Sequence, residues 1–447
     1  MKIKYTFILF FIMLSHSALA QDYFFIKKST SSYRMPFKLV NNLIIIPVHV
    51  NGKKLSFLLD TGVSSTIILN IKIKDSLKLK NVRKIRIQGL GDGDYVDALK
   101  STSNYIQIGN SIINRSHKVY LILGKGFNLS NRMGTQIDGI IGGDLFRDFV
   151  VKINYSAKII KFYKPDKYVY RKCRRCETLP LSFLYNKPYL VAQTVMADST
   201  KLNTNLLIDS GGSDALWLFE DNNIAIPKKN FIDYLGQGLN GNIYGKRSRV
   251  MSLNLGRFKL KDITVSFPDT TSLSLSMRHK DRHGSIGAST LKRFNVIIDY
   301  PHRKITLKKN TRFYNEPFNY NMSGLEVAYN GQMIVQEEKL KKYSTDSKNF
   351  VSTANKGVTI ELAYDYSYVF SLKPSVQITD IRKGSPADIA GLMVADFILE
   401  INGIPVYKLK LQDITHKFYE EDGKEVTLLI DRNGTRYSYT FKLKKIL

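Results

Sequence analysis

Cysteine and tryptophan are the scarcest residues of this 447-residue chain, which has two cysteines and one tryptophan. So few cysteines exclude a disulfide-framed scaffold and a zinc cluster built on thiolates. They stand as Cys173 and Cys176 in an Arg/Lys-rich stretch, which favours a small local disulfide over a redox motif. His279 and His283 lie four apart in a charged loop, so we expect neither a metal site nor a cofactor.

Acidic residues are also few, with 38 Asp and Glu against 67 Lys and Arg and a net charge of +29. A nucleic-acid-binding protein concentrates its positive charge on one element beside a reader motif. Here the lysines are spread along the whole chain and no such motif stands out. We interpret the excess as a solvated surface and expect no nucleic-acid partner.

Long apolar runs are missing as well. The apolar stretch Tyr5–Leu14 is well short of the roughly 20 residues that cross a bilayer. Lys2 and Lys4 precede it, and Ala18-Leu19-Ala20 follows as a small-x-small site, which is the pattern of a signal peptide cleaved after Ala20. We therefore expect a secreted or periplasmic protein that does not require membrane association; an uncleaved anchor is the alternative.

The chain repeats itself: two stretches, about 41–163 and 179–308, carry the same landmarks in the same order. Each begins with an apolar hairpin that ends in Asp-Thr/Ser-Gly. Each then has glycine-rich turns and, further on, an apolar-apolar-Gly segment before a strand that ends in Asn/Asp-Tyr. The landmark residues are Asp60, Thr61, Gly62, Gly89, Gly91, Gly93 and Gly142 in the first copy, and Asp209, Ser210, Gly211, Gly236, Gly238 and Gly287 in the second.

The strands of both copies are short and β-branched, and no long helical periodicity interrupts them. The sequence therefore predicts two similar, mostly β lobes related by a pseudo-twofold axis. Asp60 and Asp209 end equivalent strands, so the two carboxylates can meet at that axis. Carboxylates about 3 Å apart cannot both ionise cheaply and share a proton, and such a pair can activate a water molecule.

The neighbouring residues suit this arrangement. The hydroxyls of Thr61 and Ser210 can bond across the axis, and Gly62 and Gly211 permit the turn that brings the carboxylates together. Serines in both loops, Ser64, Ser65 and Ser213, are candidates for bonds to the outer carboxylate oxygens.

This repeated pattern resembles the retropepsin and pepsin clan of aspartic proteases, each copy being similar to one retropepsin-like unit. The resemblance covers about 41–310. It implies peptide-bond hydrolysis by Asp60 and Asp209, with flaps at Gly89–Gly93 and Gly236–Gly241 that close over the substrate. It also places Gly142 and Gly287 beneath the two active-site loops. The chain departs from the family at Val63 and Gly212, where a small residue such as Ala is usual.

The last third resembles a PDZ domain of the bacterial, protease-associated type. The resemblance rests on Gly384-Ser385-Pro386-Ala387, Ala390-Gly391-Leu392 and the stretch 396–403, although Ala395 stands where the family prefers Gly. It implies capture of a peptide or protein C-terminus as an added strand. The first candidates for holding its carboxylate are Ser323, Gly324 and Leu325, the second Phe370-Ser371-Leu372, with a flanking helix near Leu411–Tyr419.

The expected architecture is thus mostly β: a bilobal aspartic-protease-like domain followed by an α+β PDZ domain, a partly open β-barrel. The predicted segments are a signal peptide at 1–20, lobe 1 at 21–165, lobe 2 at 166–312, a linker at 313–321 and the PDZ domain at 322–447, with an insertion around 336–372.

Two alternatives remain for function. A catalytically inactive relative would bind peptides without cleaving them. A trypsin-like serine protease would use Ser210 with His49 as base. The serine mechanism fits poorly, because Ile208 stands where that family has a Gly before the Asp, and because it leaves the duplication of Asp-Thr-Gly unexplained.

Overall fold

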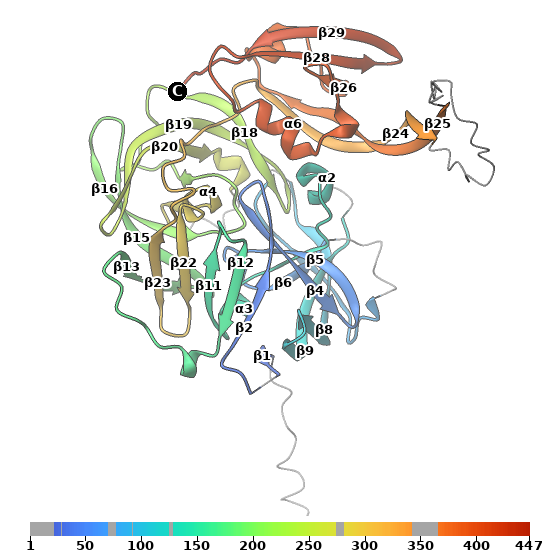
Figure 1. The fold of residues 1–447 in the computed structure, drawn as a ribbon. Helices are drawn as coiled ribbons and strands as arrows, with labels where there is room; N and C mark the ends of the chain where they lie inside the picture. Colours follow the sequence, from blue (N-terminus) through green and yellow to red (C-terminus); the bar gives the residue numbers. More distant parts are fainter. Residues whose placement is uncertain are drawn as a thin grey trace, which may run out of the picture.

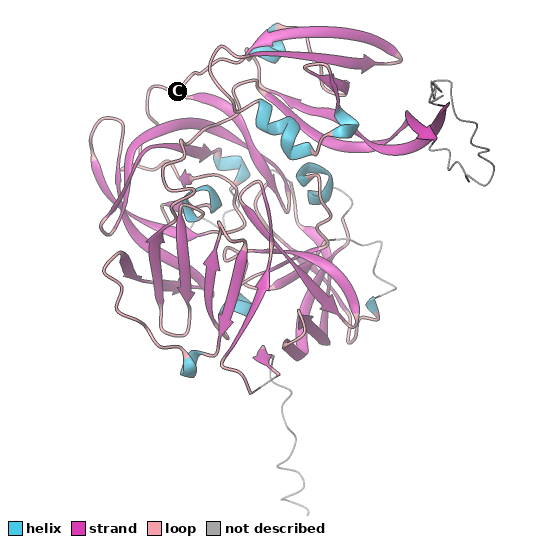
Figure 2. Ribbon diagram, in the orientation of Figure 1, coloured by secondary structure: helices cyan, strands magenta, loops and turns pink. Residues whose placement is uncertain are grey.

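The computed structural model describes residues 22–27, 29–69, 77–91, 93–124, 128–273, 281–341 and 365–447. The predicted signal peptide and His279 lie outside these residues. Strands dominate the fold and the helices are short (Figure 2). Within the described ranges, no helix has the length and apolar character needed to span a membrane.

Lobe 1 is a sheet whose strands follow the order β1-β9-β6-β10-β5-β4-β8-β7, with β3 paired to β4 (Figure 1). Its hairpin β4–β5 turns at Asn51 and Gly52, both with positive φ (48° and 89°), as the Asn-Gly pair predicts. The strands are β1 (Phe25–Ile26), β3 (Lys38–Val40), β4 (Leu43–Val50), β5 (Lys53–Leu59), β6 (Thr66–Ile68), β7 (Arg83–Ile87), β8 (Val96–Ile108), β9 (Ile112–Ile122) and β10 (Gly139–Ile141).

Lobe 2 repeats this sheet in the order β14-β15-β16-β21-β17-β20-β19-β18. In lobe 1, β10 runs parallel to β5 and antiparallel to β6; in lobe 2, β21 does the same with β16 and β17. The sequence repeat is therefore a repeat of strand pairing. The strands are β14 (Ser182–Leu184), β15 (Lys187–Val195), β16 (Lys201–Ile208), β17 (Leu216–Leu218), β18 (Phe231–Gly238), β19 (Gly241–Leu255), β20 (Phe258–Pro268) and β21 (Gly284–Ile286).

A third sheet joins the lobes, in the order β13-β23-β22-β11-β12-β2. At its centre β11 of lobe 1 pairs antiparallel with β22 of lobe 2, with Val151 opposite Ile298. One apolar core runs through both lobes and this sheet. Its strands are β2 (Ser32–Pro36), β11 (Val150–Asn154), β12 (Ile159–Tyr163), β13 (Cys176–Pro180), β22 (Phe294–Asp299) and β23 (Lys304–Lys309).

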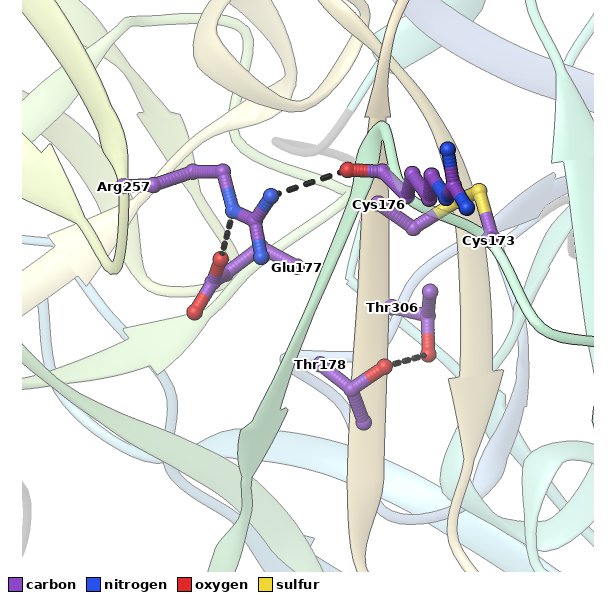
Figure 3. The surroundings of a disulfide bond; sticks show 7 residues. Cys173, Cys176, Glu177, Thr178, Arg257 and Thr306 are labelled. Carbon is purple, nitrogen blue, oxygen red and sulfur yellow. Dashed lines mark hydrogen bonds and ion pairs between the residues drawn. A yellow bond between two sulfur atoms is a disulfide. The ribbon is translucent and has the colours of Figure 1, made fainter.

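Short helices connect these strands: α2 (Leu129–Met133), α3 (Gly143–Phe146), α4 (Ala288–Leu291), η3 (Pro165–Lys167) and η4 (Thr270–Ser272). The segment between the lobes carries the disulfide Cys173–Cys176, as predicted (Figure 3). Beside it, Arg257 of lobe 2 forms an ion pair with Glu177 and donates to the carbonyl of Arg174, at 2.9 Å. The connection is thereby fixed to lobe 2.

The C-terminal domain is a separate sheet with its own apolar core, in the order β24-β25-β26-β28-β29, and β27 pairs with β26. A long hairpin, β24 (Leu325–Lys341) and β25 (Asp365–Ile381), includes all of the described part of the predicted insertion. The other elements are α5 (Pro386–Ile389), β26 (Phe397–Ile401), β27 (Ile404–Pro405), η6 (Val406–Lys408), α6 (Leu411–Lys417), β28 (Glu425–Arg432) and β29 (Thr435–Lys442).

Ala395 has φ of +79°, so the position where glycine is usual does require the left-handed region. An L-residue in this region costs about 1–2 kcal/mol of conformational free energy. Glycine avoids this cost but loses more chain entropy on folding, which offsets part of the gain. We expect Ala395→Gly to stabilise the C-terminal domain by about 0.5–1 kcal/mol, seen as slower amide hydrogen exchange in β26 and β28. Ala390→Gly, at φ −70°, is the control and should lower stability by a similar amount; equal effects of the two changes would contradict this account.

Candidate active site

Asp60 and Asp209 directly follow β5 and β16, and a backbone hydrogen bond holds each of these two positions. The amide of Asp60 donates to the carbonyl of Ile141 and that of Asp209 to the carbonyl of Ile286, both at 2.9 Å. Ile141 and Ile286 belong to the apolar-apolar-Gly segments, so the third landmark of the repeat supports the first.

The two loops are tied together by Thr61 and Ser210, which are buried. The hydroxyl of Thr61 donates to the carbonyl of Ile208 (2.6 Å) and accepts from the amide of Ser210 (3.0 Å). The hydroxyl of Ser210 donates to the carbonyl of Leu59 (2.9 Å) and accepts from the amide of Thr61 (3.0 Å). Each hydroxyl thus satisfies a donor and an acceptor of the opposite lobe, which fixes the separation of the loops.

The carboxyl groups lie where these loops meet. A Cβ on Gly62 would stand 2.8 Å from Asp209 Oδ1, and one on Gly211 would stand 2.2 Å from Asp60 Cγ. Any side chain at either glycine would collide with the opposite carboxyl. The glycine amides also bind the carboxyl of their own loop: Gly62 donates to Asp60 Oδ1 (2.7 Å), and Gly211 and Gly212 donate to Asp209 Oδ1 (3.0 Å each).

The environment holds a proton on this pair. Burial, then the charge of Asp209 and a hydrogen bond between the two carboxyls, raise the pKa of Asp60 well above its ordinary value, against the opposing effect of the Gly62 amide. One carboxyl of the pair can therefore act as an acid while the other acts as a base.

Val63 and Gly212, the two departures from the family pattern, act here through their backbone. The carbonyl of Val63 accepts from the amide of Gly143, and that of Gly212 from the amide of Ala288, both at 2.7 Å. These contacts start α3 and α4 and need no particular side chain. Gly142 and Gly287 lie under the loops as expected: a Cβ on Gly142 would stand 2.1 Å from Val63 O, and one on Gly287 2.2 Å from Asp214 O.

The loop serines do not all behave as expected. The hydroxyl of Ser64 donates to the carbonyl of Tyr185 (2.8 Å), not to a catalytic carboxylate, and the carbonyl of Ser213 accepts from the side chain of Asn42 (3.1 Å). Asn42 and Tyr185 lie in equivalent hairpin turns. A hairpin turn of each lobe therefore forms a hydrogen bond with the active-site loop of the other lobe.

The predicted flaps are hairpin ends that meet. The side chain of Asn240 accepts from the amide of Gly89 (2.7 Å), its carbonyl accepts from Gly93 (2.8 Å), and its amide donates to Leu90 (2.9 Å). Leu239 packs on an apolar cluster of lobe 1. Gly236 and Gly238 lie in β18, which leads to this tip, and Gly91 donates to the carbonyl of Ser272 (3.0 Å).

A buried chain of charges, which no sequence motif marks, runs from the second active-site loop to the C-terminal domain. Arg247 pairs with Asp214 (3.3 Å) and with Asp233 (2.7 Å), and Arg382 pairs with the other oxygen of Asp233 (3.1 Å). Burial, and then Asp233, raise the pKa of Glu326 beside this chain to about 7. The residues belong to distant strands, so only the fold reveals the pairing.

The C-terminal domain has the parts of a peptide-binding edge. The loop Ser323–Leu325 precedes the edge strand β24, and α6 lies against that strand. The amides of Ser323 and Gly324 donate to Asn321 Oδ1 (3.1 Å each), and that of Leu325 to Ser323 Oγ (3.0 Å). All three amides thus have acceptors within the domain, and Ser323 and Leu325 are buried. The second candidate, 370–372, lies within β25, away from this loop.

Helix α2 of lobe 1 also lies against β24, beneath α6 (Figure 1). Gln412 of α6 hydrogen-bonds the carbonyl of Met133, and a Cβ on Gly134 would stand 2.5 Å from Leu411 Cβ. Lobe 1 therefore occupies part of the space between β24 and α6.

Comparison with known proteins agrees with this division. Residues 46–145 match the model of an aspartyl protease family, and residues 377–432 match that of a PDZ domain. The chain thus combines an aspartyl-protease-like domain with a PDZ domain on a mostly β fold.

A "Probable CtpA-like serine protease" of Staphylococcus saprophyticus is 37% identical over 71 residues, 16% of this chain and 14% of that protein. The chain therefore spans about a seventh of that relative. A match of this length is too short to contain both Asp60 and Asp209.

The raised pKa of Asp60 gives a prediction for stability. The folded chain holds this proton more tightly than the unfolded chain, so the free energy of unfolding falls as pH rises from about 3.8 through the folded pKa. Asp60→Asn removes the carboxyl whose ionisation lowers the free energy of unfolding, and it keeps an acceptor for the Gly62 amide. We expect the variant to be more stable than wild type at neutral pH by at least about 1 kcal/mol, with no gain below pH 3.8.

Urea unfolding followed by the fluorescence of Trp217, the single tryptophan of the chain, measures the effect. Asp198→Asn is the control: its carboxyl is exposed and the Thr200 amide lowers its pKa, so its removal brings no gain. A gain in Asp60→Asn that is the same at pH 3 and pH 7 would contradict the prediction.

Proposed function

We propose that the chain is an aspartic endopeptidase. The observation that carries the proposal is the pair of adjacent carboxyls of Asp60 and Asp209, held by reciprocal hydroxyl contacts where two similar lobes meet. The ionised member takes a proton from a water molecule, which attacks the peptide carbonyl, while the protonated member donates to the carbonyl oxygen. The roles belong to the pair, because the carboxyls share one proton.

The flaps complete the proposal. Their tips are joined by hydrogen bonds at Asn240, so a substrate must enter by parting them and is enclosed when they close again. Closure excludes water that is not part of the reaction. The matching strand pairing of the lobes supports the view that each is a retropepsin-like unit.

We propose further that the protein acts in the cell envelope or outside the cell, with residues 1–20 as a cleaved signal peptide. The disulfide Cys173–Cys176 fits an oxidising compartment. The N-terminal sequence of the protein recovered from its host tests the cleavage after Ala20.

Cleavage of an unfolded protein substrate tests the mechanism. We expect Asp60→Asn and Asp209→Asn each to lower kcat by a factor of at least about 100, the usual contribution of a positioned acid or base, and pepstatin to block the wild type. Activity should fall as pH rises past the folded pKa of the pair, because the acid loses its proton.

Asp198→Asn serves as the control for this assay. Retained cleavage in both dyad variants, with loss in Ser210→Ala, would point to the serine mechanism instead. An intact chain that binds the substrate without cleaving it would identify the inactive, peptide-binding alternative.

The PDZ domain is proposed to bind peptide or protein C-termini at Ser323–Leu325 and along β24. We expect a labelled peptide to bind the full chain through its free carboxylate and to bind at least about tenfold more weakly when amidated, since a charged hydrogen-bond acceptor is lost. Gln412→Ala, which frees α6 from Met133, should tighten binding because α2 covers part of the same edge. Equal binding of both peptides would exclude carboxylate recognition.

A further inference from the structure

The two lobes differ in charge at equivalent positions beside the catalytic pair. Leu43 opens β4 after a turn and pairs with Val40; Lys187 opens β15 after the same kind of turn and pairs with Leu184. Lys187 thus takes in lobe 2 the place that Leu43 takes in lobe 1.

A second pair of equivalent positions follows from the backbone. In lobe 1 the amide of Leu69 donates to the carbonyl of Asp138, and in lobe 2 the amide of Phe219 donates to that of His283, both at 2.8 Å. Phe219 therefore corresponds to Leu69. Ile137 directly precedes Asp138, and Arg282 directly precedes His283, so Arg282 corresponds to Ile137.

In lobe 1 these positions are apolar and face the flaps. Leu43, Leu69 and Ile137 belong to one buried cluster, on which Val63 of the active-site loop also packs. Leu239 of the second flap packs on the same cluster, as do Ile85 and Ile87 of β7, the strand that leads to the first flap. The equivalent positions of lobe 2 must face the other side of the catalytic pair.

In lobe 2 the same region carries two cations. The register Tyr189–Leu207 of β15 and β16, continued by two residues, sets Lys187 opposite Asp209. Arg282 is 7% exposed and lies just before β21, which runs parallel to β16, the strand that Asp209 follows. The strand registers therefore place both cations beside the loop that carries Asp209.

Neither cation forms an ion pair with a described residue. Burial lowers the pKa of both cations, and the charge of Asp209, together with that of Asp60 at Lys187, opposes this lowering. Within the described ranges Arg282 donates its Nε to the carbonyl of Gly284, at 3.3 Å, and its guanidinium lies over the ring of Phe219, 5.0 Å from the ring centre. Lys187 is partly buried and forms neither a hydrogen bond nor an ion pair within the described part of the chain. Buried charges are normally paired, because leaving them unpaired costs desolvation energy.

We propose that Lys187 and Arg282 form a specificity site for an acidic side chain of the substrate, next to the scissile bond. The preferred substrate is then a peptide with Glu or Asp on one side of the cleaved bond. This inference rests on the proposed peptidase function.

A pair of peptides that differ only by Glu against Gln beside the cleaved bond tests the site. We expect wild type to cleave the Glu peptide with kcat/KM at least about tenfold higher, since a charge-assisted contact is gained. The preference should fade below about pH 4, where glutamate is protonated. Lys187→Met and Arg282→Met should each reduce the ratio toward one, mainly through KM for the Glu peptide.

Lys201→Met, at an exposed position that opens β16, is the control and should keep the wild-type ratio. The ratio cancels any general effect of a variant on the catalytic pair or on folding. If Lys187→Met slows both peptides equally and shifts the pH profile, the lysine acts on the catalytic pair and the specificity site is wrong. Cleavage of both peptides at equal rates by wild type likewise overturns the site but leaves the peptidase function intact.

If no peptide is cleaved, a binding measurement still tests the specificity site. The same labelled peptides are then titrated into wild type and Lys187→Met by fluorescence anisotropy. Tighter binding of the Glu peptide by about tenfold, lost in the variant, supports the site even though the peptidase function has failed. Equal binding of both peptides refutes the site.

Discussion

The reciprocal hydrogen bonds between Thr61 and Ser210 are the constraint on which the rest of the site depends. Each hydroxyl links an amide and a carbonyl of the opposite lobe, so neither loop can shift without breaking bonds in both. This linkage sets how far apart the two carboxyls stand. Their separation in turn determines whether they share a proton, because two close carboxylates cannot both be charged at moderate cost. The chemistry thus follows from a contact that involves no catalytic atom.

Much of this arrangement could be predicted from the sequence because the chain contains the same pattern twice. Asp-Thr-Gly alone is common, but its recurrence with glycine-rich turns and an apolar-apolar-Gly segment predicts both lobes and the place where they meet. The structure confirms the mostly β fold and the disulfide Cys173–Cys176. The hairpin at Asn51-Gly52 was predictable for a local reason, since the turn needs two positive φ angles.

What the sequence could not provide were contacts between positions distant in the chain. The ion pairs of Asp233 with Arg247 and Arg382 join strands of two domains, and nothing near these residues marks them. Ser64 was misjudged for the same reason: it looked suited to the carboxylate, but its hydroxyl donates to the carbonyl of Tyr185 from the other lobe. Lys187 and Arg282 were also missed, because only the matching strand pairing of the lobes shows that they replace Leu43 and Ile137.

The sheet that joins the lobes has a consequence for how the chain acquires its structure. Its central strand β11 ends at Asn154, but its partner β22 begins only at Phe294. The edge strand β13 likewise pairs with β23, which ends at Lys309. During synthesis, lobe 1 is complete before β22 has been made, so β11 lacks its partner strand on that side. Such distant pairings make folding slow and leave an unpaired strand exposed meanwhile. The first half of this protein must therefore be kept from pairing wrongly until most of the second half has been made.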